Sequence, residues 1–171
     1  MSVPGLSWES LGDLGVGRPN LGATMRVEAY RLMLFSLRDV LDDQLGVERA
    51  KTVMYMAGHN AGRVFANKIG SDTADLAKNT TTLQETLLEM GIGVLRFEMT
   101  DMENGRLELT VSEDLDCSGV PDCGETLCVY DEGFISGTLE VFTGKRFDVT
   151  EVECWATGSR TCRFVAVAVD K

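Results

Sequence analysis

Apolar residues recur every three or four positions in four segments of the chain, which is the spacing of an amphipathic α-helix. Three of these segments, 24–44, 47–67 and 73–90, fill most of the first half of the chain. Within the third, the capping-box spacing of Thr82-x2-Glu85 predicts a break near the middle and a fresh helix start. The fourth segment, 126–142, lies in the second half among shorter elements. The pattern therefore predicts three consecutive helices and one later helix.

Around the fourth helix the apolar period changes to two, which is the spacing of a half-buried β-strand. Segments 92–100 and 107–111 flank Asn104-Gly105, a dipeptide typical of a tight β-hairpin. Segments 146–150 and 162–169 flank a polar turn and form a second hairpin. The predicted fold is α+β: N-terminal helices packed on an antiparallel sheet of about four strands, followed by a C-terminal helix and β-hairpin.

Glycine pairs mark two of the predicted helices. Gly58-x3-Gly62 removes side chains from one stripe of the second helix, so another backbone can approach closely there. Gly133-x3-Gly137 lies on the apolar stripe of the fourth helix. The spacing predicts close packing at these positions.

The first 22 residues differ from the rest of the chain. They hold five glycines interspersed with Trp8 and several leucines, a composition that disfavours a regular helix. We interpret residues 1–22 as an N-terminal arm that docks on its own domain or on a second subunit, with a frayed terminus as the alternative. Residues 23–171 are interpreted as a single domain.

The charge of the chain excludes several classes of partner. A formal net charge of -11 and a pI near 4.5 argue against binding to nucleic acid or to an anionic membrane surface. Every apolar run is interrupted before it could span a bilayer, and no signal peptide is apparent. We expect a cytoplasmic protein without nucleic-acid or membrane partners, in a reducing compartment where disulfides are rare.

Three cysteines and a glutamate at the end of the chain have the character of metal ligands. Glu151 and Cys154 follow one predicted strand, Cys162 opens the next, and Cys128 lies at the start of the fourth helix. Four such ligands can close a tetrahedral shell around zinc, and a closed shell favours a structural over a catalytic ion. Strict alternation places Glu151 and Cys154 on opposite strand faces, so a β-bulge is predicted between them.

The same residues resemble a known family. The ending Glu-x2-Cys-x-Ala-x-Gly-x3-Cys-x-Phe, preceded by a Cys-x4-Gly-x3-Gly helix, is similar to the 4-vinyl reductase domain, which also forms the sensor region of aromatic-responsive bacterial transcription activators. The resemblance covers roughly 18–169 and implies a hydrocarbon- or aromatic-binding sensor domain with a zinc site. The zinc ligands it implies are Cys128, Glu151, Cys154 and Cys162. No ligand-pocket residue of the sensors matches this sequence, so the ligand-binding residues stay unassigned.

Cys117 and Cys123 leave alternatives open. They flank Pro121 in a polar loop, where either could replace Glu151 and make the zinc site all-thiolate, or both could be ordinary loop residues. His59 is the only histidine and has no carboxylate or nucleophile at a suitable spacing. We therefore predict no catalytic residues.

The preferred function is a domain that binds or senses a hydrophobic or aromatic small molecule and is stabilised by structural zinc. We expect a homodimer that acts through a separate effector protein, and no enzymatic activity. Two alternatives remain: an accessory protein or reductase acting on the vinyl groups of tetrapyrroles, and a protein-interaction module, since the family's fold also resembles subunits of Golgi vesicle tethering complexes.

Overall fold

The computed structural model describes residues 5–70 and 75–169. Residues up to Val53 and residues from Met54 on form two compact units, which are described separately. The first unit contains a short 3-10 helix η1 (Glu9–Leu11), helix α1 (Leu14–Gly17) and helix α2 (Val27–Leu45). Helix α3 (Val47–Ile69) begins in the first unit and continues into the second. The predicted arm, 1–22, thus contains only short helices over its described residues, and its docking stays a prediction.

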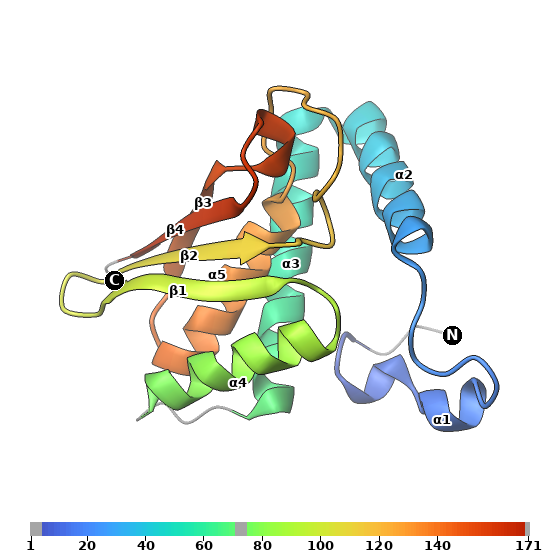
Figure 1. Ribbon diagram of the computed structural model, residues 1–171, viewed down its shortest axis with the longest axis horizontal. Coiled ribbons are helices and arrows are strands. Elements are labelled where there is room, and N and C mark those ends of the chain that lie inside the picture. Colours follow the sequence, from blue (N-terminus) through green and yellow to red (C-terminus); the bar gives the residue numbers. More distant parts are fainter. Residues whose placement is uncertain (1–4, 71–74, 170–171) are drawn as a thin grey trace. The chain divides into compact units, whose positions relative to one another are not determined.

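The second unit is built around a four-stranded antiparallel sheet, which confirms the predicted fold class (Figure 1). Its strands are β1 (Val94–Asp101), β2 (Arg106–Ser112), β3 (Phe147–Glu153) and β4 (Cys162–Ala168). Their order in the sheet is β1-β2-β4-β3, so the last strand pairs with both β2 and β3. The terminal hairpin therefore adds to the first hairpin through β4.

One face of the sheet carries the hydrophobic core. Leu109 of β2 pairs with Phe164 of β4, Leu107 pairs with Ala166, and all four side chains are buried. Helix α5 (Val129–Thr143) lies against β3, and helix α4 (Leu76–Glu89) lies against β1. The described helices include none with the length and apolar character needed to cross a membrane.

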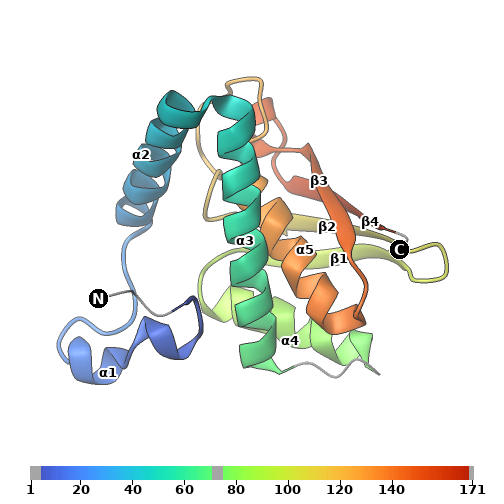
Figure 2. The same ribbon diagram turned by 180° about the vertical axis from the view of Figure 1, so that it is seen from behind.

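Helices α3 and α5 pack backbone to backbone at the predicted glycine pairs, as the view from behind shows (Figure 2). An alanine Cβ at Gly58 or Gly62 would lie 2.0 or 2.1 Å from a carbonyl oxygen of α5. A Cβ at Gly133 or Gly137 would lie equally close to carbonyl oxygens of α3. The expected close approach is confirmed, and each pair turns out to be the partner of the other.

Helix α4 differs from the prediction because it is continuous. Asp75 caps its start by accepting a hydrogen bond from the backbone N–H of Lys78 at 2.9 Å. The hydroxyls of Thr80 and Thr81 bond back to the carbonyl of Ala77. The helix absorbs its threonines in this way, so the predicted break is wrong and the Thr82-x2-Glu85 pattern is not a cap.

Helix α3 also buries a different stripe from the one its periodicity suggested. Met54, Phe65 and Ala66 are buried, together with the glycines between them, whereas Val53 and Met56 are 41% and 59% exposed. Glycine has no hydrophobic side chain to signal a buried face, so the stripe that α5 covers is under-represented in the apolar pattern.

Candidate metal centre

Four cysteines meet at one end of the second unit. Cys117 lies in the loop after β2, Cys128 is the N-cap of α5, Cys154 follows β3 and Cys162 opens β4. Each side chain is at most 1% exposed, and the four Sγ atoms lie within 4.8 Å of one another. Three of the four predicted ligands are therefore brought together, and Cys117 joins them.

The spacing of the sulfur atoms suits a single tetrahedral ion. The Sγ of Cys128 lies 3.9 Å from that of Cys154 and 3.8 Å from that of Cys162. With metal–sulfur bonds of about 2.3 Å, the edge of a sulfur tetrahedron is about 3.8 Å. The Sγ atoms of Cys117 and Cys162 are closer, at 3.1 Å. The donor set thus fits a mononuclear thiolate site.

A β-bulge brings Cys154 into the cluster. The register between β3 and β4 shifts between Glu151, which pairs with Phe164, and Glu153, which pairs with Arg163. The extra residue reverses the facing of the chain after Glu151. The backbone N–H of Cys154 then donates to the hydroxyl of Thr157 in the turn. The bulge predicted from the alternation is confirmed.

Cys117 reaches the cluster through its loop and the strand order. The carboxylate of Asp114 accepts hydrogen bonds from the backbone N–H groups of Asp116 and Cys117, which folds the loop back at the end of β2. Because Val111 near that end pairs with Cys162, the loop closes beside the first residue of β4. The Asp114-x2-Cys117 spacing is typical of such a side-chain turn and was the one sequence signal for this position.

Glu151 borders the four sulfur atoms without belonging to their group. It continues the inward stripe of β3 and is 5% exposed. Its Oε2 accepts a hydrogen bond from the backbone N–H of Cys128 at 3.1 Å, whereas its buried Oε1 has no hydrogen-bond partner among the described residues. Burial, and then the charge of Cys154, raise the pKa of Glu151 to about 8. Its predicted role as a ligand stays a prediction.

The thiols shift one another's pKa values when no ion is bound. Hydrogen bonds from Cys117, Cys128 and Cys162 lower the pKa of Cys154 far below that of a free thiol. Contacts with Cys117 and then Cys154 raise the pKa of Cys128. One thiolate is therefore stabilised by its neighbours, and a cation would be needed to hold more than one.

Cys123 lies outside the cluster. It is exposed, and its Sγ lies 3.7 Å from the carbonyl oxygen of Glu125. Its backbone N–H donates to the carbonyl of Ala156 at the tip of the terminal hairpin. This loop cysteine thus anchors its segment through the backbone, and its thiol remains at the surface.

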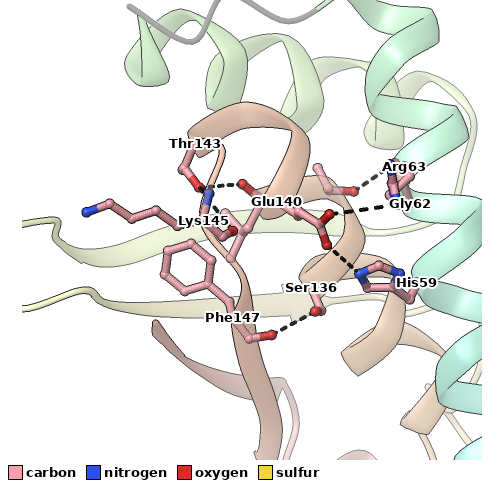
Figure 3. A network of polar contacts seen from close by, with 10 residues as sticks. His59, Gly62, Arg63, Ser136, Glu140, Thr143, Lys145 and Phe147 are labelled. Carbon is pink, nitrogen blue, oxygen red and sulfur yellow. Dashed lines mark hydrogen bonds and ion pairs between the residues drawn. The ribbon is translucent and has the colours of Figure 1, made fainter. Parts of the chain in front are cut away.

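His59 takes part in a polar network towards the other end of α5 (Figure 3). Its Nε2 lies 2.9 Å from Oε2 of Glu140, and the Arg63 guanidinium lies 3.8 Å from the other oxygen of that carboxylate. Twelve residues of helix separate Cys128 from Glu140, or roughly 18 Å along the axis. The histidine therefore links α3 to α5 and is remote from the cysteines.

Similar proteins match most of this chain. The 4-vinyl reductase domain profile matches residues 107–168, which include Cys117, Cys128, Cys154 and Cys162. The protein MJ1642 of Methanocaldococcus jannaschii is 31% identical over 150 residues, covering 88% of this chain and 82% of the relative. This chain belongs to the 4-vinyl reductase domain family. A second relative from the same organism, MJ0150, is 28% identical over 113 residues, and the match covers 66% of this chain and 64% of that protein's length.

Solved structures share this 4-vinyl reductase fold at low sequence identity. The phenol-responsive sensory domain of the transcription activator PoxR superposes with a TM-score of 0.62 at 17% identity, covering 85% of this chain and 76% of that chain. A vinyl-4-reductase family protein from Methanocaldococcus jannaschii gives 0.62 at 20% identity, covering 87% and 85%. A trafficking protein particle complex subunit 3 from Naegleria fowleri, covalently bound to palmitic acid, gives 0.64 at 15%, covering 84% and 95%.

Proposed function

We propose that this member of the 4-vinyl reductase domain family is a small-molecule-sensing domain for an apolar or aromatic compound, stabilised by a structural zinc ion. The buried group of four thiols is the observation that carries the zinc proposal. Membership of the family supports the sensing role, as does a fold shared with a domain that responds to phenol.

In this proposal Cys117, Cys128, Cys154 and Cys162 hold the ion. Four thiolates complete a tetrahedral shell, so the ion would act as a cross-link and leave no position open for a substrate. Glu151 would then lie outside the ligand shell, where its Oε2 fixes the N-terminus of α5 through the N–H of Cys128. The zinc would tie the β2 loop, the start of α5 and both strands of the terminal hairpin together.

The ligand is proposed to be apolar because two relatives of the fold are described with such compounds. One responds to phenol, and another carries palmitic acid. A cleft of about 770 Å³ at the far end of the sheet is less suitable, since Glu103, Glu140, Lys145 and Arg146 line it with charges. We therefore propose that the ligand binds among the helices and the core face of the sheet.

Phenol and palmitate are expected to bind saturably to the purified full chain and to raise its thermal unfolding midpoint, as measured by calorimetry. A ligand at about 100 times its Kd stabilises the native state by about 2.7 kcal/mol. Cyclohexanol, of similar size but not aromatic, is the control for phenol, and Lys145→Glu is the control for the charged cleft. Absence of binding by both probes would contradict the sensing role, and a tetrapyrrole absorbance in the purified protein would favour the accessory or reductase alternative.

We also propose a homodimer formed through α2. This helix has no buried residue, and Leu32, Met33 and Val40 are 75%, 60% and 56% exposed. Burying such apolar surface against a second copy would be favourable. Sedimentation is expected to give twice the chain mass of 18.7 kDa. The Leu32→Lys variant should give the monomer and the matched Glu28→Lys variant the dimer; a monomeric wild type would contradict the proposal. A separate effector protein stays a prediction.

A further inference from the structure

Carboxylates crowd against one side of the four-cysteine cluster. Asp114 lies in the β2 loop and Asp131 in the first turn of α5, and one carboxylate oxygen of each lies within 4.8 Å of the Cys128 Sγ and of the other. Cys128 therefore belongs to two donor groups, one made of four sulfurs and one made of a sulfur and two carboxylates. Both groups are built from residues distant in sequence.

Asp131 has an oxygen that nothing in the described chain satisfies. Its Oδ2 is buried and has no hydrogen-bond partner, and Asp131 forms no ion pair within residues 5–70 and 75–169. The same is true of Oε1 of Glu151, whose side chain is 5% exposed. Burying an unpartnered carboxylate oxygen is costly, so two of them beside one cluster of thiols indicate a missing positive charge.

The nearby arginines do not supply that charge. The Arg160 guanidinium lies over the ring of Trp155 at 4.9 Å, and Arg163 pairs with Glu153 at 3.3 Å. One divalent ion among four thiolates leaves a net charge of about -2 on the cluster, to which the carboxylates add. A single ion in the cysteine site therefore does not compensate the charge buried at this end of the domain.

We propose that Asp114, Asp131 and a bridging Cys128 thiolate bind a second divalent transition-metal ion beside the first. Carboxylate oxygens together with one thiolate suit a cation of borderline softness such as Zn²⁺ or Co²⁺ better than Mg²⁺ or Ca²⁺. The inference rests on the proposed zinc site, because Cys128 contributes to both groups. It assigns the unpartnered oxygen of Asp131 a direct role as a ligand.

Native mass spectrometry of the full chain, reloaded with Zn²⁺ after chelation, tests the stoichiometry. Two ions per chain are expected for the wild type. Asp131→Asn, which keeps the shape of the side chain, should hold one ion and weaken the second by at least about 100-fold. Cys128→Ser should impair both sites. Asp148→Asn, an exposed acid on β3, is the matched control and should bind as the wild type does.

Titration of the metal-free protein with Co²⁺ separates the two sites spectroscopically. The first equivalent should produce the intense sulfur-to-metal charge-transfer absorption of a thiolate site, and the second only a small further change. One ion per chain in the wild type, or an unchanged second equivalent in Asp131→Asn, would overturn the second site and leave the first intact. Absence of any bound ion would instead overturn the zinc proposal as well, so the two failures are distinguishable.

Discussion

Replacing Gly133 by alanine is expected to lower the free energy of unfolding by at least about 3 kcal/mol, which for a chain of this size is roughly a 10 °C drop in melting temperature. The added Cβ would lie 2.0 Å from the carbonyl oxygen of Tyr55 and 2.8 Å from the backbone nitrogen of His59. Both obstacles are helix backbone, which cannot rotate aside as a long side chain can. The helices must separate, and the core that α5 covers loosens with them.

Thermal unfolding followed by circular dichroism measures the effect. Gly62→Ala should behave similarly, because its Cβ would meet the carbonyl oxygen of Phe134 at 2.1 Å. Gly17→Ala is the matched control: this helical glycine has open space around it, and alanine there should be neutral or slightly stabilising. A Gly133→Ala protein as stable as the wild type would show that α3 and α5 are not packed backbone to backbone.

Replacing Cys162 by serine is expected to abolish zinc binding by the purified protein and to lower its melting temperature by about 10 °C or more. Cys162 opens β4, the strand that pairs with both β2 and β3, so losing this ligand releases the ion at the centre of the sheet. Elemental analysis measures the zinc, and calorimetry measures the stability. A chelator should lower the melting temperature of the wild type and leave that of Cys162→Ser nearly unchanged.

Three further variants identify the fourth ligand. Cys117→Ser should lose the zinc if the site is all-thiolate, whereas Glu151→Gln should retain it and keep the hydrogen bond from the N–H of Cys128. The reverse result would restore the ligand set Cys128, Glu151, Cys154 and Cys162. Cys123→Ser removes an exposed thiol and is the control for a general effect of losing a cysteine. Full zinc content in Cys162→Ser would contradict the site altogether.

Local patterns in the sequence predicted most of the elements. Helical periodicity located α2, α3 and α5, and the Asn104-Gly105 turn located the β1–β2 hairpin. The bulge after Glu151 followed from alternation alone, because two predicted ligands could not otherwise share a face. These features depend on residues close together in the sequence, where the period and the turn chemistry are sufficient.

The strand order and the position of Cys117 could not be predicted in the same way. Cys117 meets Cys162 across 45 positions of sequence because β4 inserts beside β2, and no local pattern specifies that neighbour. The buried stripe of α3 was misplaced for a related reason, since Gly58 and Gly62 bury backbone in place of apolar side chains. Long-range packing decided both features.

The glycine contacts have a mechanical consequence for α5. With no side chains between them, α5 and the segment of α3 from Met54 on interlock carbonyl by carbonyl, and neither can slide past the other without a collision. Cys128 fixes one end of this rod at the sulfur cluster, and Glu140 near the other end grips His59. A displacement at the cysteines is therefore transmitted along α5 as a rigid translation or tilt, and α3 is carried with it.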